Sequence, residues 1–168
     1  KRLESNNLQP LCHACHAKKT SEEKFTNRPE WIRTPVADVV LVCGPPASGK
    51  SKYVEEKAEE DDIVIDLDEI RCRLTGKPIY QWENKEFLSE AINERNSQLD
   101  ALSYEENRGK RVWFILSAPK FSTREWWSNK LHAHLVMMDT SREVCLSRVY
   151  KDSRRKHNTK YHVALVYQ

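Results

Sequence analysis

The sequence predicts an α/β fold in which helices cover both faces of a mainly parallel sheet, forming a three-layer sandwich. From residue 37 onward, short apolar runs alternate with segments of helical periodicity, which is the pattern of βαβ units. The run Asp38–Cys43 is continuous, β-branched and apolar, as in a parallel strand that is buried on both faces. The loop Gly44–Ser51 then carries two of the chain's four glycines and leads into a helical pattern.

Four strands are expected, because four short segments are apolar and rich in β-branched or aromatic residues. They are Asp38–Cys43, Ile63–Asp66, Arg111–Leu116 and His134–Met138. No fifth strand is expected after Asp152.

Helices are expected between and after these strands, at 50–60, 69–74, 83–108 and 154–168. In the 83–108 segment the apolar residues recur at three- and four-residue steps. Gly76 and Gly109 are expected to end the two helices that precede them. Two further helices are expected to begin at capping boxes. These boxes are Ser122–Glu125, with a helix through Leu131, and Thr140–Glu143, with a helix to about Asp152.

Composition divides the chain into three parts and excludes several classes of protein. Residues 1–25 are a polar partial unit, 26–36 contain two prolines and form a linker, and 37–168 form the α/β domain, expected to be truncated at its C-terminus. Lys and Arg number 28 and Asp and Glu 25, so a net charge of +3 gives no charge-based argument for nucleic acid. The chain has no apolar run near the ~20 residues that cross a bilayer. Five cysteines, an odd number, are typical of a reducing compartment, so we expect a soluble cytoplasmic protein without a membrane partner.

The loop after the first strand has the spacing of a phosphate-binding loop, Gly44-x-x-x-x-Gly49-Lys50-Ser51. Backbone N–H groups of such a loop surround a phosphate, and the helix that follows adds its positive N-terminal end. Lys50 is expected to reach the β- and γ-phosphates, and the Ser51 hydroxyl to bind Mg²⁺. The cofactor-binding residues are therefore expected to be Gly44, Pro45, Pro46, Ala47, Ser48, Gly49, Lys50 and Ser51, with ATP and Mg²⁺ as cofactors, in a P-loop NTPase fold.

Carboxylates follow the second strand, at the edge of the sheet where open α/β folds keep their sites. Asp68 is a candidate base or metal ligand, and Arg71 lies on the same face of a helical turn, where its planar fork can bind a substrate phosphate. Asp66 competes with Asp68 for the first role or serves as the ligand of Mg²⁺. The alternative is that Asp68 is only the N-cap of a solvated helix and that Arg71 lies on its surface.

Strand, GxxxxGKS loop, helix, strand and Asp-x-x-Arg together resemble the polynucleotide-kinase-like (AAA_33-type) group of small P-loop kinases. The resemblance covers about Val39–Asp152. It implies that Asp68 activates a 5′-hydroxyl and that Arg71 holds a phosphate of the acceptor. It also implies arginines of a lid after the fourth strand, and the catalytic Arg148 and the cofactor-binding Arg154 and Arg155 occupy that position. The alternative is that these three arginines lie on a solvated basic helix face.

Four other residues after the third strand have two interpretations each. Lys120 and Arg124 are either part of an acceptor groove or surface residues. The pair Trp126 and Trp127 is either a packing element or a platform for base stacking, and packing is favoured.

The N-terminal segment contains Cys12-His13-Ala14-Cys15-His16, half of the four-ligand set of a structural zinc site. Residues 7–20 resemble the last third of an HNH endonuclease with a zinc knuckle. The resemblance implies that Cys12 and Cys15 are zinc ligands, that Asn7 is the family's middle asparagine and that His16 is a metal ligand. The general base and the first Cys pair have no counterpart, so nuclease activity is not expected. An unstructured tail is the alternative, and the fusion implies a bacterial or phage-infected cell.

The sequence thus favours an enzyme that transfers the γ-phosphoryl group of ATP to a nucleic-acid 5′-hydroxyl. A nucleotide or nucleoside kinase is the second interpretation, because only the acceptor would differ. An ATPase switch module coupled to the nuclease is the third. No Walker-B pair of acidic residues follows an apolar strand, apart from the imperfect Asp68-Glu69, which favours transfer over hydrolysis.

Overall fold

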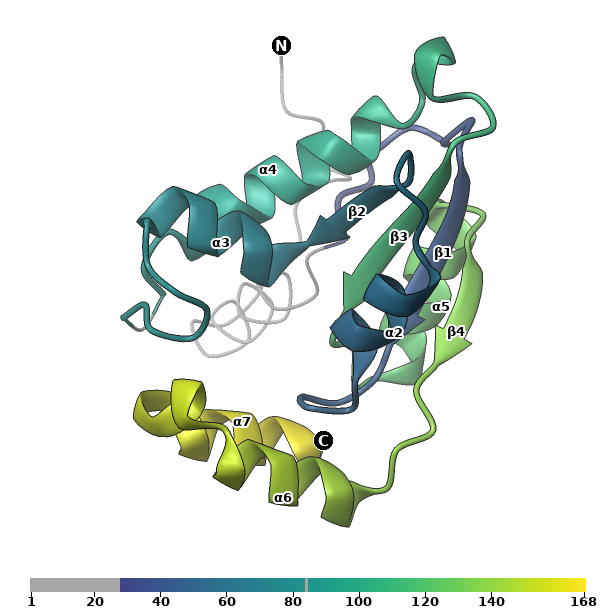
Figure 1. Cartoon of the computed structure of the whole chain (residues 1–168). Helices are drawn as coiled ribbons and strands as arrows, with labels where there is room; N and C mark the ends of the chain where they lie inside the picture. Colours follow the sequence, from purple (N-terminus) through teal and green to yellow (C-terminus); the bar gives the residue numbers. More distant parts are fainter. Residues whose placement is uncertain (1–27, 84) are drawn as a thin grey trace, which may run out of the picture.

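The structure is a computed structural model that describes residues 28–83 and 85–168. Its four strands are β1 (Asp38–Cys43), β2 (Ile63–Asp66), β3 (Arg111–Leu116) and β4 (His134–Met137). They form one sheet in the order β2-β3-β1-β4, and every neighbouring pair is parallel (Figure 1). The predicted α/β class and parallel sheet are confirmed, and no strand follows Asp152 among the described residues.

Helices pack on both faces of this sheet and make the three layers. Helix α2 (Lys50–Lys57) covers one face, where Val54 packs with residues of β1 and β3. Helices α4 (Leu88–Ala101) and α5 (Phe121–Lys130) cover the other face. Their side chains Leu99 and Trp127 belong to a core cluster that also contains Leu41 and Phe114. The alternation of buried side chains along β1 and β3 therefore serves two cores at once.

The remaining helices lie at the carboxyl edge of the sheet. Helix α3 (Leu67–Thr75) follows β2 directly. Helix α6 (Arg142–Lys151), a 3₁₀ helix (Ser153–Asn158) and helix α7 (Thr159–Val166) form what we name the C-terminal helical segment, residues 142–166. It has a small core of its own, built on Cys145, Val149 and Val166. Figure 1 shows this segment below the carboxyl ends of the strands, opposite α3.

Two predicted helix boundaries are wrong around α4. The helix begins at Leu88 instead of residue 83, because Lys85 and Phe87 have φ angles of 60° and 49° and cannot continue a right-handed helix. It ends at Ala101, with Leu102 as the C-cap, and a separate 3₁₀ helix (Glu105–Asn107) precedes Gly109. Gly109 has φ 74° but terminates this short helix region, not α4.

Both predicted capping boxes are also corrected. Helix α5 begins at Phe121, because the Lys120 carbonyl already accepts hydrogen bonds from the next turn, and Ser122 lies inside the helix. Helix α6 is capped by Ser141, whose hydroxyl accepts from the Val144 N–H group at 3.4 Å. Thr140 instead donates its hydroxyl to the Ser48 carbonyl at 2.8 Å, so it ties the end of β4 to the phosphate-binding loop.

The remaining predictions concern the bounds of α2 and α3, membrane spans and the N-terminal unit. Helix α2 ends at Lys57, three residues before the predicted end, and α3 extends two residues further toward the N-terminus than predicted. Gly76 caps α3 with φ 65°, as predicted. Within residues 28–83 and 85–168, no helix has the length and hydropathy that a membrane span requires. The predicted zinc-knuckle unit, with Cys12, Cys15 and His16, lies outside the described residues.

Candidate functional site

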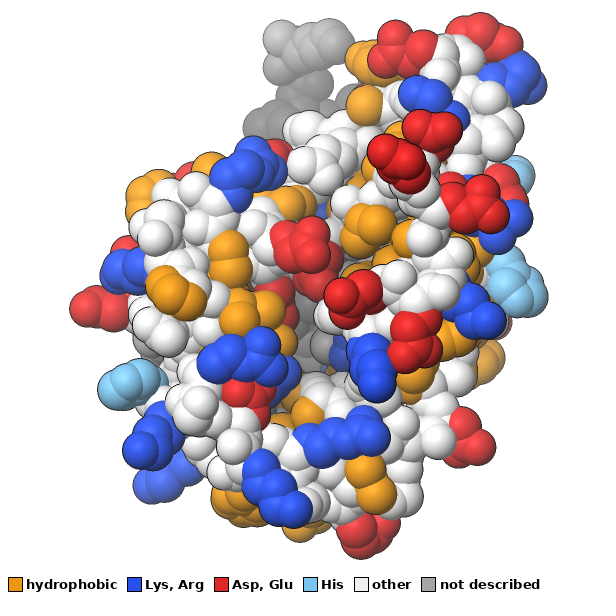
Figure 2. Space-filling model, in the orientation of Figure 1, with side chains coloured by type: hydrophobic (Ala, Val, Ile, Leu, Met, Phe, Trp, Pro, Cys, Tyr) orange, Lys and Arg blue, Asp and Glu red, His pale blue; other side chains and the backbone are white. Residues whose placement is uncertain are grey.

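A cleft of about 1160 Å³ opens at the carboxyl edge of the sheet. Five parts of the chain line it: the loop between β1 and α2 with the start of α2, the first turn of α3, the loop that joins α3 to α4, the end of β3, and the C-terminal helical segment. Figure 2 shows the hollow between that segment and the rest of the domain, with Lys and Arg side chains numerous along its lower side. This is the position at which open α/β sheets bind their ligands.

The loop between β1 and α2 has the backbone geometry of an anion site. Ala47 and Gly49, two positions apart in the loop, have positive φ angles of 60° and 97°, and left-handed residues of this kind occur in anion-binding nests. Helix α2 has no side-chain cap and no acidic residue in its first turn. Its first N–H groups and the positive end of its dipole therefore remain available for an anion.

Lys50 is buried beneath this loop, with 9% of its surface exposed. Its Nζ donates to the carbonyl oxygens of Gly44 at 2.8 Å and Pro45 at 2.9 Å. Burial lowers the pKa of Lys50 to about 8, and the carboxylates of Asp68 and Asp66 oppose this shift. The cation is thus held within the loop and close to both carboxylates.

Close packing below the loop explains the first glycine of the motif. A Cβ atom on Gly44 would lie 2.6 Å from the Ser48 hydroxyl and 2.9 Å from Met138 Cβ. The Ser48 hydroxyl is buried without a hydrogen-bond partner among the described residues. Gly44 and Pro45 line a smaller cavity of about 210 Å³ instead of the cleft, whereas Pro46, Ala47, Gly49, Lys50 and Ser51 line the cleft.

The two aspartates at the end of β2 both line the cleft. Asp66 is the N-cap of α3 and accepts a hydrogen bond from the Asp68 N–H group at 2.9 Å. Burial and the nearby Asp68 carboxylate raise the pKa of Asp66 to about 7. Burial also raises the pKa of Asp68, although a hydrogen bond with Tyr80 and the cations Arg155 and Lys50 oppose the shift. The cap role that the sequence left open for Asp68 belongs to Asp66.

The oxygen donors of the cleft suit a small divalent cation. In many P-loop proteins the strand beside the loop supplies a metal-binding aspartate. Here β3 ends at Leu116, and the next residue, Ser117, lines the cleft without a carboxylate. The candidate ligands of Mg²⁺ are therefore the Ser51 hydroxyl and the β2 carboxylates, with phosphate oxygens and water completing the set. No group of three metal-ligating side chains occurs among the described residues.

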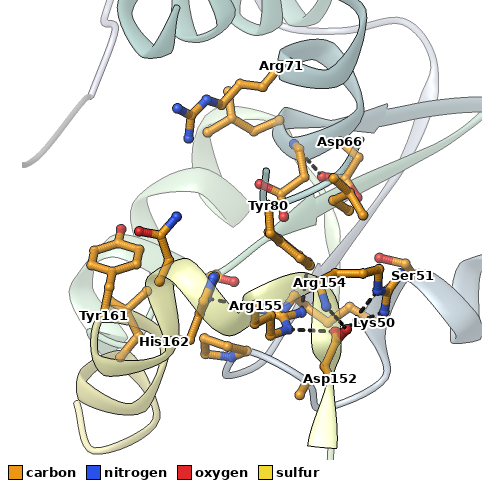
Figure 3. Close-up of a pocket in the computed structure, with 18 of the residues that line it drawn as sticks. Lys50, Ser51, Asp66, Arg71, Tyr80, Asp152, Arg154, Arg155, Tyr161 and His162 are labelled. Atoms are coloured by element: carbon orange, nitrogen blue, oxygen red, sulfur yellow. Dashed lines mark hydrogen bonds and ion pairs between the residues drawn. The ribbon is translucent and has the colours of Figure 1, made fainter. Parts of the chain in front are cut away.

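Arg71 lies on the opposite wall of the cleft from the phosphate-binding loop (Figure 3). Its Nε and Nη2 atoms donate to the Glu86 carbonyl at 3.2 and 2.8 Å. Its guanidinium carbon lies 4.4 Å from the centre of the Trp82 ring. Burial lowers the pKa of Arg71, and Asp68 opposes that shift. The loop that joins α3 to α4 therefore orients the Arg71 side chain through a carbonyl and an aromatic ring.

The three predicted lid arginines all line the cleft, with different partners. Arg148 is exposed and donates to the Ala47 carbonyl at 3.2 Å, beside the phosphate-binding loop. Arg154 makes two hydrogen bonds to Asp152, at 2.8 and 2.9 Å. Arg155 is buried, with 6% of its surface exposed, and donates to Asp152 at 3.0 Å.

Other residues singled out by the sequence do not reach the cleft. Arg124 donates to the carbonyls of Ala118 and Pro119 and lines the smaller cavity, and Lys120 lines neither cavity. Trp127 is buried in the core, and Trp126 packs against it with the rings 4.8 Å apart. The pair therefore has the packing role that the sequence favoured.

Several residues of the cleft were missed by the sequence analysis. They come from the irregular loop before α4 and from the end of the chain, and they are Tyr80, Trp82, Lys151, Asp152, Tyr161 and His162. Two aromatic residues in a proline-containing loop were the only available signal, because no periodicity places such a loop on a strand or helix.

Comparison with known proteins identifies one family. A family model described as an AAA domain, AAA_33, matches residues 39–164, three quarters of the chain. No curated protein matches the chain. The matched residues run from β1 into α7 and include the elements that line the cleft.

Proposed function

This chain belongs to the AAA_33 family of P-loop kinase-like domains, and from that membership we propose that it transfers the γ-phosphoryl group of ATP to the 5′-hydroxyl of a nucleic acid. One observation carries the proposal. A partly buried carboxylate, Asp68, and an arginine, Arg71, lie in the same cleft as the phosphate-binding loop and across from it. The position of Arg71 suits a side chain that binds a phosphate of the acceptor, a group that hydrolysis of ATP does not involve.

The donor side supports ATP as the source of the phosphoryl group. The nest at residues 44–51 and the uncapped N-terminus of α2 bind the phosphates, and Lys50 moves from the loop carbonyls to the β- and γ-phosphate oxygens. Arg148, beside the loop, neutralises negative charge on the phosphoryl group during its transfer. Ser51 and Asp66 would hold Mg²⁺, which would further neutralise the phosphate charge.

The acceptor side supports in-line attack by a hydroxyl group. The acceptor oxygen attacks the γ-phosphorus, the bond to the β,γ-bridging oxygen breaks, and ADP leaves. Asp68 accepts the proton of the attacking hydroxyl, and its raised pKa makes it a better base than an exposed aspartate. Arg71 binds a phosphate of the acceptor and so holds the hydroxyl in line.

The distribution of charge favours a polyanionic acceptor. The C-terminal helical segment with the last two residues, 142–168, contains seven Lys and Arg against two Asp and Glu, a net charge of +5. Residues 28–141 contain 16 Lys and Arg against 20 Asp and Glu, a net charge of −4. The excess of positive charge thus lies in the segment that forms one wall of the cleft, and four of its seven Lys and Arg residues line that wall, where they can attract a phosphodiester chain. Exposed Tyr161 on the same wall offers a ring for stacking a base.

The test is phosphoryl transfer from γ-labelled ATP with Mg²⁺ to a 5′-hydroxyl oligonucleotide, beside a panel of nucleosides and nucleotides. Asp68→Asn and Lys50→Ala are expected to abolish labelling. Their matched controls, Asp61→Asn and Lys57→Ala, change exposed residues outside the cleft and keep the parent's rate.

Each pattern of label has a defined meaning. Label on the oligonucleotide that both site variants lose supports the proposal. Label found only on a nucleoside or nucleotide would mean that the acceptor is a small molecule and that the transfer mechanism is unchanged. Free phosphate without a labelled acceptor contradicts transfer and supports an ATPase switch.

A further inference from the structure

Tyr80 has a backbone conformation that a tyrosine rarely adopts. Its φ angle is 65°, in the left-handed region, where a side chain costs about 1–2 kcal/mol. Lys85 and Phe87 in the same loop also have positive φ angles. Such conformations persist only where the surrounding structure holds them, and they gather at functional sites. The contacts of Tyr80 should therefore show what holds this loop.

Those contacts come mostly from the C-terminal helical segment. The Arg155 guanidinium stacks on the Tyr80 ring, with 3.8 Å from its carbon to the ring centre. Arg155 Nη2 donates to the Tyr80 hydroxyl at 2.8 Å. The His162 ring packs edge-on against the Tyr80 ring, with centroids 5.0 Å apart. Figure 3 shows Arg155 between Tyr80 and His162, with Asp152 on its other side.

Every nitrogen of the Arg155 side chain has a protein partner. Nε donates to Asp152 at 3.0 Å, Nη1 bonds His162 Nδ1 at 3.0 Å, and Nη2 bonds Tyr80. Burial is the main cause that lowers the pKa of His162 to about 4, so its ring is neutral at pH 7 and accepts from Arg155. Asp152 neutralises the cation, so this buried arginine is charge-paired and each of its nitrogens is hydrogen-bonded.

The structure assigns Tyr80 and Arg155 to a clasp that fixes the loop of residues 76–87 to the C-terminal helical segment, with Arg155 as a positioning residue instead of a phosphate ligand. The loop supplies both groups that orient Arg71, namely the Glu86 carbonyl and the Trp82 ring. The clasp thereby fixes the acceptor wall of the cleft relative to the basic wall. Its consequence for catalysis rests on the proposed function, whereas its existence does not.

The test compares Tyr80→Phe and Arg155→Lys with the parent chain. Tyr80→Phe removes one oxygen atom and keeps the ring, and Arg155→Lys keeps the charge but loses the fork. Tyr150→Phe is the matched control, because Tyr150 lies on α6, is 67% exposed and lines neither cavity. The first readout is amide hydrogen exchange, resolved by segment, without nucleotide.

Both clasp variants are expected to raise exchange at residues 76–87 and 159–166 together, by about tenfold or more, because one hydrogen bond to a charged group is lost. The strands keep the parent's protection, and Tyr150→Phe changes nothing. The double variant exchanges less rapidly than the product of the two single effects predicts, because both substitutions remove the Arg155–Tyr80 bond. A rise in only one segment, or in neither, overturns the clasp.

The second readout is the transfer assay with the 5′-hydroxyl oligonucleotide. The clasp variants are expected to raise KM for the acceptor several-fold and to leave KM for ATP unchanged. A higher KM for ATP in Arg155→Lys, with unchanged exchange at residues 76–87, makes Arg155 a phosphate ligand and overturns the proposal. If the parent chain transfers no label, the proposed function fails, and hydrogen exchange alone decides on the clasp.

Discussion

Replacement of Lys50 by methionine is expected to stabilise the protein while it abolishes ATP binding. The ammonium group is buried beneath the phosphate-binding loop, and burial is the main cause that lowers its pKa to about 8. An unfolded chain restores the ordinary pKa of 10.5. The drop from 10.5 to about 8 corresponds to about 3 kcal/mol of destabilisation at pH 7.

The substitution also removes favourable interactions, which reduce the gain. Lys50 makes two hydrogen bonds to loop carbonyls, and each contributes about 1 kcal/mol. Methionine has a similar length and no charge to bury, so the net gain in the free energy of unfolding is about 1 kcal/mol. That gain raises Tm by about 2–4 °C for a chain of this size.

The pH dependence distinguishes this reasoning from a simple packing effect. The folded pKa lies below the unfolded pKa, so the cost of burying the cation is complete below pH 8 and disappears as the pH rises to 10.5. The advantage of Lys50→Met should shrink across that window. The assay is urea denaturation at pH 7 and at pH 10, with thermal shifts in Mg·ATP at pH 7.

Saturating ATP should raise the Tm of the parent and leave that of Lys50→Met unchanged. The reasoning is refuted if Lys50→Met is less stable than the parent at pH 7, or if its advantage is the same at both pH values.

Three further predictions follow from the site. In the parent, the folded pKa of Asp66, about 7, lies above the ordinary 3.8, so the free energy of unfolding should fall as the pH rises from about 4 to 7 and the buried carboxyl group ionises. Asp66→Asn should remove this fall, as measured by urea titrations at both pH values. Gly44→Ala should destabilise the fold by about 1–3 kcal/mol through overpacking against Ser48, whereas Gly76→Ala, where the new Cβ meets nothing within 4 Å, should cost only the left-handed strain of about 1–2 kcal/mol. Ser117→Asp adds a carboxylate just after β3, the strand beside the phosphate-binding loop, so it should tighten the binding of Mg²⁺ in the presence of ADP, as measured by calorimetry. An unchanged affinity would mean that a carboxylate at position 117 does not reach the metal ion.

Strands and the phosphate-binding loop could be predicted from sequence because their determinants are local. Strands β1, β2 and β3 have the predicted bounds, since a short β-branched or aromatic run between polar turns admits few alternatives. The two glycines of the loop are likewise explained by local geometry: there is no room for a Cβ atom at Gly44, and Gly49 has a positive φ angle.

The walls of the cleft were harder to predict because long-range contacts determine them. Phe87 fits the helical period of α4 but lies outside the helix, since the loop before it contains left-handed residues. Arg155 appears in the sequence only as one of several basic residues near the C-terminus. Its bond to Tyr80, 75 positions earlier in the chain, leaves no trace in local periodicity.

β3 lies between β1 and β2 in the sheet, and this order determines the distance between the phosphate-binding loop and the aspartates. The phosphate-binding loop leaves β1 and the aspartates leave β2, so two inter-strand spacings, about 10 Å in total, separate the points of departure. Pairing keeps the strand ends level, because Cys43 pairs with Leu116 and Asp66 pairs with Ile115. Backbone hydrogen bonds of the sheet thus set the distance between the phosphate-binding loop and the candidate base, and side-chain substitutions leave this distance unchanged. Any divergence toward a wider or narrower acceptor must therefore occur in the 76–87 loop and in residues 142–166.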